Sequence, residues 1–182
     1  MKQFLAALSL LLMAFACTRD PAPTIPQNGG FYDLSGYITA ETERLTTARM
    51  RVEKSITLNG ETEKKVLDAN NFANDLRLFR EADINKPAWS DKYVTREELL
   101  SGNHKKTTYL ATDSSLIVRR LMVEEDLGAT TKIEIDRKTG TLLSDGKHRL
   151  VYDPARGYRV TTLQTNRFGD DVDAVIEVAW MR

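Results

Sequence analysis

The sequence has very little cysteine and histidine. Cys17 is the only cysteine, and His104 and His148 are the only histidines. One thiol cannot form a disulfide within the chain, and three such side chains cannot supply the four ligands of a usual structural zinc site. The fold must therefore be stabilised by packing, and the residues favour no metal and no other cofactor.

Net charge is also absent, because 26 lysines and arginines are balanced by 26 aspartates and glutamates. A chain without surplus positive charge gives no electrostatic reason to expect nucleic acid as a partner. Long apolar runs are missing too: the longest, Phe4 to Phe15, covers about a dozen residues, whereas a membrane-spanning helix needs about 20.

The residues around Cys17 suggest where the protein is sent. Lys2 gives a positive start, the apolar run follows, and the small residues Ala14 and Ala16 precede Cys17, a pattern typical of an export signal. The segment resembles the lipobox of bacterial lipoproteins, which implies that Cys17 begins the mature chain and carries lipid on its sulfur. An ordinary secreted protein, cleaved near Ala16 and left with a free thiol, is the alternative.

Residues 18–30, "TRDPAPTIPQNGG", are rich in proline and glycine and predict an extended tether. We therefore expect a signal peptide at 1–16, a lipid anchor and tether at 17–30, and one folded domain at 31–182. Thr18 stands where an aspartate retains some lipoproteins at the inner membrane. The resemblance thus implies an outer-membrane lipoprotein of the cell envelope, facing either the periplasm or the cell surface.

Two helices are expected on the amino-terminal side of the domain. Residues 31–47 place Phe31, Leu34, Ile38 and Leu45 on one side at helical spacing, which predicts an amphipathic helix packed on the core. A second stripe, formed by residues 72, 76 and 79, predicts another helix, begun by Asp68 or Asn70 and stopped by Pro87.

Between these helices, Asn59-Gly60 predicts a tight β-hairpin, because both residues tolerate the positive φ of a type I′ turn. With a two-residue loop, Leu58 faces Glu61 and Val52 faces Leu67. The tip then has few apolar pairs, so we expect it to project into solvent.

From Lys106 onward, short apolar segments alternate with turns, and the spacing is too short for crossover helices. The expected fold is α+β: an antiparallel meander of about six strands, as a curved sheet or partial barrel, with the helices and the hairpin packed on it. The six segments are "TTYLAT", "LIVRRLMVEE", "TKIEID", "TLLSDGKHRLVYD", "GYRVTTLQTN" and "DAVIEVAWM".

Few residues suggest chemistry. Trp89, in a Pro-Ala-Trp turn, either plugs one end of the core or offers a stacking ring, and together with Tyr93 it is a possible binding surface. His148 could serve as a general base only beside a nucleophile or carboxylate, and no motif supplies one. The acidic groups at 124–126 and 170–173 lack the spacing of a calcium loop.

The chain resembles, over most of its mature length, a group of small lipoproteins of Bacteroidetes-type bacteria. The resemblance is carried by the lipobox, the tether and the segments "FYDLSGYITAETERL", "LFREADINKPAW" and "IEIDRKTGTLL". The last segment also resembles strand-turn-strand repeats of the PepSY kind. Neither resemblance implies an activity or catalytic residues.

These observations favour a non-enzymatic envelope lipoprotein, held to the membrane through Cys17 and acting as a binding or accessory module. Its partner would be an envelope protein or an apolar ligand, such as an acyl chain sheltered between the sheet and the helices. A surface-exposed lipoprotein that binds glycans or proteins is the alternative, and a hydrolase using His148 is a third.

Overall fold

The computed structural model describes residues 30–181, so Cys17, the expected signal peptide and most of the tether lie outside the described residues. The first helix, α1, spans Leu34–Thr47 and begins three residues after the predicted start. Asp33 sets this start, because its carboxylate accepts a hydrogen bond from the Gly36 backbone nitrogen at 2.9 Å. Phe31 therefore precedes the helix, although its side chain is buried as predicted.

The predicted hairpin is present as strands β1 (Arg51–Leu58) and β2 (Glu61–Leu67). Its predicted register is confirmed, since Leu58 pairs with Glu61 and Val52 pairs with Leu67. Asn59 and Gly60 both have positive φ, as the turn requires. Leu58 is half exposed, but the predicted projection of the tip is wrong, because Leu58 pairs with Ala174 of the last strand and the Asn59 backbone N–H donates to the Asp173 carbonyl at 2.8 Å.

The second predicted helix is wrong in length. Two single turns, α2 (Phe72–Asp75) and α3 (Arg77–Arg80), replace it, Asn71 is the N-cap, and the helix ends well before Pro87. The predicted stripe is nevertheless buried, because residues 72, 76 and 79 are at most 2% exposed. We attribute the break to Asp75, whose carboxylate is tied to Lys54 on β1 and so turned toward the sheet.

The sheet contains nine antiparallel strands, in the order β2-β1-β9-β8-β7-β6-β5-β4-β3. The six predicted segments correspond to six of these, but the predicted count of about six was too low. The hairpin joins the same sheet by pairing β1 with β9, and β3 (Tyr93–Ser101) extends it at the other edge. The remaining strands are β4 (His104–Ala111), β5 (Val118–Asp126), β6 (Ala129–Gly140), β7 (Ser144–Asp153), β8 (Gly157–Asn166) and β9 (Val172–Met181).

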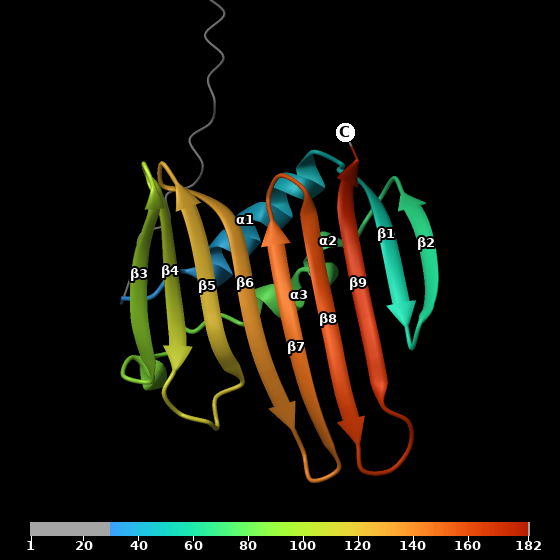
Figure 1. Ribbon diagram of the computed structural model, residues 1–182. Helices are drawn as coiled ribbons and strands as arrows, with labels where there is room; N and C mark the ends of the chain where they lie inside the picture. Colours follow the sequence, from blue (N-terminus) through green and yellow to red (C-terminus); the bar gives the residue numbers. More distant parts are fainter. Residues whose placement is uncertain (1–29, 182) are drawn as a thin grey trace, which may run out of the picture.

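All three α-helices lie on one face of the sheet, which we call the inner face (Figure 1). The opposite face, here the outer face, is covered by no described helix or strand (Figure 1). A short 3-10 turn, η1 (Pro87–Trp89), leads into β3. No helix among residues 30–181 is long and apolar enough to cross a membrane.

Two tyrosines on the inner face fasten the helices to the sheet. The Tyr152 hydroxyl on β7 donates to the Glu41 carboxylate on α1 at 2.6 Å. The Tyr158 hydroxyl on β8 donates in the same way to Asp75 on α2. The rings of both tyrosines contact Phe79 edge-on, with centroids 5.8 and 5.9 Å away. Each tyrosine thus joins apolar packing to a hydrogen bond between the layers.

Gly157, at the start of β8, is held in a conformation that only glycine adopts readily. Its φ is +143°, and a Cβ built there would lie 1.8 Å from the Val178 carbonyl oxygen on β9. The close approach lets Trp180 of β9 donate its backbone N–H to the Arg156 carbonyl at 2.9 Å and its indole N–H to the Pro154 carbonyl at 3.2 Å. The β7–β8 turn is therefore locked onto the last strand.

We predict that Gly157→Ala lowers the free energy of unfolding by at least about 3 kcal/mol, because the new Cβ overlaps a backbone oxygen that cannot move aside. Gly169→Ala is the matched control, since Gly169 also has positive φ but a Cβ there meets nothing within 4 Å. The control should lose about 1 kcal/mol in urea unfolding. Equal losses for the two variants would contradict the packing argument.

Candidate functional site

Glu134 lies at the centre of the outer face and is buried there although no second layer covers it. Its side chain is held by Lys132 at 2.6 Å, Arg149 at 2.8 Å and Arg120 at 3.1 Å, and the stems of these side chains shield it from water. Arg120 also binds the Asp136 carboxylate at 2.7 Å. Five charged side chains from strands β5, β6 and β7 thus form one network.

The cations around Glu134 determine its pKa. Burial alone would raise that pKa, but the hydrogen bonds from Lys132 and Arg120, together with the charge of Arg149, outweigh burial and lower the pKa from 4.5 to about 2. Glu134 is therefore ionised at neutral pH and fixes the positions of Arg120 and Arg149. A carboxylate that stays ionised and is bound by three cations is unsuited to act as a general acid or base.

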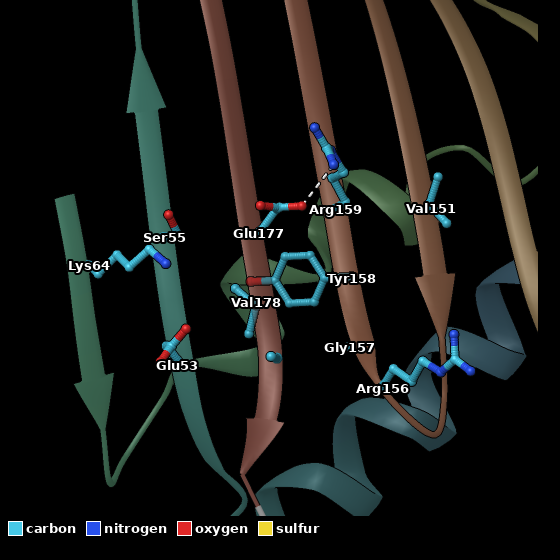
Figure 2. Close-up of a pocket in the computed structure, with 11 residues that line it drawn as sticks. Glu53, Ser55, Lys64, Val151, Arg156, Gly157, Tyr158, Arg159, Glu177 and Val178 are labelled. Atoms are coloured by element: carbon cyan, nitrogen blue, oxygen red, sulfur yellow. Dashed lines mark hydrogen bonds and ion pairs between the residues drawn. The ribbon is translucent and has the colours of Figure 1, made fainter. Parts of the chain in front are cut away.

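Between this network and the β7–β8 turn the outer face is hollowed, and we call this the Gly157 hollow; Figure 2 shows its lining residues. Its volume is about 370 Å³. Small residues form its floor, since Gly157 pairs directly with Ala179. Figure 2 shows Arg159 and Glu177 joined across one side at 2.8 Å. The charged lining residues are of both signs: Glu53, Lys64, Arg156, Arg159 and Glu177.

A second hollow, the Lys138–Lys147 hollow, lies on the other side of the network and has a volume of about 330 Å³. Lys138 on β6 and Lys147 on β7 are direct cross-strand partners. Like charges directly opposite each other destabilise a sheet, so this pair is unfavourable for folding. The lining residues are Arg119, Asp136, Arg137, Lys138, Lys147, His148, Arg149, Thr161 and Leu163.

The rim of the Lys138–Lys147 hollow is cationic because its one carboxylate is already occupied, whereas most of the exposed lining is apolar. Asp136 is bound to Arg120, and Arg149 is shared with Glu134. Neither Lys138 nor Lys147 forms an ion pair with any carboxylate of residues 30–181. Positive charge surrounding an apolar floor that includes Leu163 can hold an anion attached to an apolar group.

The two aromatic residues predicted as a binding surface lie at the core. Tyr93 is 7% exposed, its hydroxyl donates to the Val118 carbonyl at 2.9 Å, and burial raises its pKa to about 12. Trp89 is half-buried and packs against the same core. The Lys86 ammonium lies 4.1 Å from the centre of the Trp89 ring, on the face that a stacked ligand would use.

His148 lies on the inner face between two threonines. Its Nε2 is 3.0 Å from the Thr139 hydroxyl, and its Nδ1 is 3.0 Å from the Thr162 hydroxyl. Burial and the nearby Arg137 charge lower its pKa below the usual value. Both ring nitrogens are satisfied by hydroxyls and no described carboxylate orients the ring, an arrangement typical of a structural histidine.

Two further expectations from the sequence concern metal binding and lipid attachment. Among residues 30–181, no three histidine, cysteine or acidic side chains come close enough to hold a metal ion. Cys17, the predicted lipid attachment site, lies outside the described residues.

Sequence reasoning missed the Lys138–Lys147 hollow because it placed the β6–β7 turn too early. The predicted strand segments "TKIEID" and "TLLSDGKHRLVYD" left residues 137–140 between them, which put Lys138 into a turn. In the structure β6 continues to Gly140 and the turn is Thr141–Leu143. The register of this hairpin, Gly140 with Asp145, would have revealed that the two lysines face each other.

No family model, curated protein or solved structure matches this chain. The function must therefore be argued from its own residues.

We predict that Glu134→Gln lowers the free energy of unfolding at neutral pH by about 1–3 kcal/mol, because three cations lose their shared anion. Since the folded-state pKa lies below the ordinary value, the ionised carboxylate stabilises the fold above about pH 4.5, and this contribution is lost as the pH falls toward 2. The difference in free energy of unfolding between the variant and the wild type should therefore disappear in acid.

Urea unfolding of both proteins between neutral pH and about pH 2 measures this difference. Glu43→Gln removes an exposed carboxylate of α1 outside the network and serves as the control. A Glu134→Gln deficit that stays constant across the pH range would show that the charge network does not stabilise the sheet.

Proposed function

We propose that the protein is a lipid-anchored lipoprotein of the bacterial cell envelope, most simply of the outer membrane, and that it acts as a non-enzymatic binding module. The anchor is supported by the small residues before Cys17 and by the short apolar run preceding them. The binding role is supported by one observation above all: the whole outer face of a nine-stranded sheet is left uncovered by described helices and carries two hollows.

The outer face is a better ligand surface than the space between the helices and the sheet. On the inner side, Phe72, Leu76 and Phe79 are at most 2% exposed and pack directly on sheet side chains. This close packing argues against an acyl chain lying beside them. We therefore place the ligand of the module on the outer face.

The alternative, a surface-exposed module that binds glycans by aromatic stacking, is less well supported. It relied on Trp89 and Tyr93, of which Tyr93 is buried and Trp89 is covered by Lys86. A hydrolase has weaker support still, because His148 meets only threonine hydroxyls.

The predicted tether would let the domain reach the membrane in more than one orientation. Residues 18–30 number thirteen. As an extended, proline-rich segment with about 3.1 Å per residue, they would span about 40 Å. A strand of ten residues, such as β7, measures about 33 Å. Either end of the sheet can therefore be brought to the bilayer by the same anchor.

The anchor is tested by growing cells that express the protein with an alkyne-bearing fatty acid. The wild-type chain should take up the label, Cys17→Ser should not, and the variant should appear in the soluble fraction. Lys64→Gln, an exposed substitution far from the leader, serves as the control and should be labelled normally. Label on Cys17→Ser, or none on the wild type, would refute the anchor.

A further inference from the structure

One end of the sheet carries exposed apolar side chains beside the Lys138–Lys147 hollow. The β6–β7 and β8–β9 turns both lie at the lower edge of the sheet in Figure 1. Leu142 is 91% exposed and Leu143 58%, both in the β6–β7 turn, and Phe168 of the neighbouring turn is 78% exposed. The Arg167 backbone N–H donates to the Leu143 carbonyl at 2.8 Å, so the two turns are held together.

The apolar turn and the cationic hollow are continuous. Leu163 lines the hollow, is 50% exposed, and pairs across the strands with Lys147. The hairpin that carries Lys138 and Lys147 ends three residues beyond Lys138 in the turn with Leu142 and Leu143. Apolar side chains at a tip, with cations about 10 Å behind them along the strands, match the layers of a bilayer whose headgroups are anionic.

We propose that this end of the sheet is a second membrane contact, in which the Lys138–Lys147 hollow takes the phosphate of an anionic phospholipid while Leu142 and Leu143 enter the acyl region. The inference rests on the proposed function, because it names the ligand of the outer face of an envelope lipoprotein. A soluble phosphate compound would explain the cations but would leave the exposed leucines without a role.

Acidic groups at the same end limit how the contact is made. Asp170 and Asp171 lie in the β8–β9 turn, where the Asp171 carboxylate accepts the Asn166 backbone N–H at 2.9 Å. Asp145 pairs with Gly140 beside the β6–β7 turn. The β6–β7 turn therefore enters the bilayer first, and the β8–β9 turn stays at the headgroup level with its carboxylates in water. The attraction is accordingly sensitive to salt.

The test uses residues 18–182, without leader and without Cys17, because the described core is formed by Phe31 and residues that follow it. Cosedimentation is measured with vesicles of phosphatidylcholine alone and with vesicles that also contain phosphatidylglycerol. Binding is expected only to the anionic vesicles. Lys138→Gln combined with Lys147→Gln should weaken it at least about tenfold, since each lysine near an anionic surface favours binding.

Lys65→Gln combined with Arg77→Gln removes the same charge from two exposed side chains, on β2 and α3, that line neither hollow, and should leave vesicle binding nearly unchanged. Leu142→Ser combined with Leu143→Ser should weaken binding to the anionic vesicles without changing the melting temperature, because both leucines are exposed. The Lys138, Lys147 double variant should melt no lower than wild type, because it removes a repulsion, and this excludes misfolding as the cause of lost binding.

Three results would overturn the proposal: no binding of the wild type to anionic vesicles, equal losses in the lysine double variant and its control, or displacement by inorganic phosphate when ionic strength is held constant by lowering the chloride concentration. The last would assign the hollow to a soluble phosphate compound. Because the tested chain lacks Cys17, the result is independent of acylation. Vesicle binding without fatty-acid labelling would refute the anchor alone, and labelling without vesicle binding would refute this inference alone.

Discussion

The structure depends on a one-sided attachment: the helices are fastened to a single face of the sheet by hydrogen bonds from tyrosine to carboxylate. Tyr152 holds Glu41 of α1, and Tyr158 holds Asp75 of α2. Both carboxylates are also bound by a cation, Glu41 by Arg44 and Asp75 by Lys54. A buried carboxylate with these partners is satisfied, whereas one without them would strongly destabilise the fold. These bonds hold the helices on the inner face of the sheet and so leave the outer face uncovered.

An open sheet face must be made compatible with water. The outer face achieves this with charge, because the cations around Glu134 cover the sheet with their stems and turn their charged ends to solvent. The same arrangement accounts for the two hollows, which lie where the network ends. One has small residues and mixed charge, and the other has an unneutralised pair of lysines. The repulsion between Lys138 and Lys147 would be relieved by an anionic ligand, which is the reason for proposing one at this hollow.

The sequence predicted those parts of the fold in which a local signal and burial agree. Asn59-Gly60 determined the hairpin register correctly, since turn chemistry acts over two residues. Strand β3 could not be predicted, because eight of its nine residues are exposed. The alternation of apolar and polar residues that identifies a strand arises only when one face of that strand is buried. The break after Asp75 could not be predicted, because it depends on Lys54, a partner distant in sequence. The Lys138–Lys147 hollow could not be predicted, because its lysines face each other only in the register set by the β6–β7 turn. That turn has no Asn-Gly signal from which the register could be deduced.

In the proposed membrane contact, the outer face and the β6–β7 turn meet the bilayer and the helices are turned away from it. A polarity-sensitive fluorophore tests this most directly, attached through Leu142→Cys in residues 18–182 and, for comparison, through Glu43→Cys on the exposed side of α1. With anionic vesicles, the emission of the label at residue 142 should shift to the blue, and that of the label at residue 43 should not. A blue shift at residue 43 alone, or at neither position, would contradict the account.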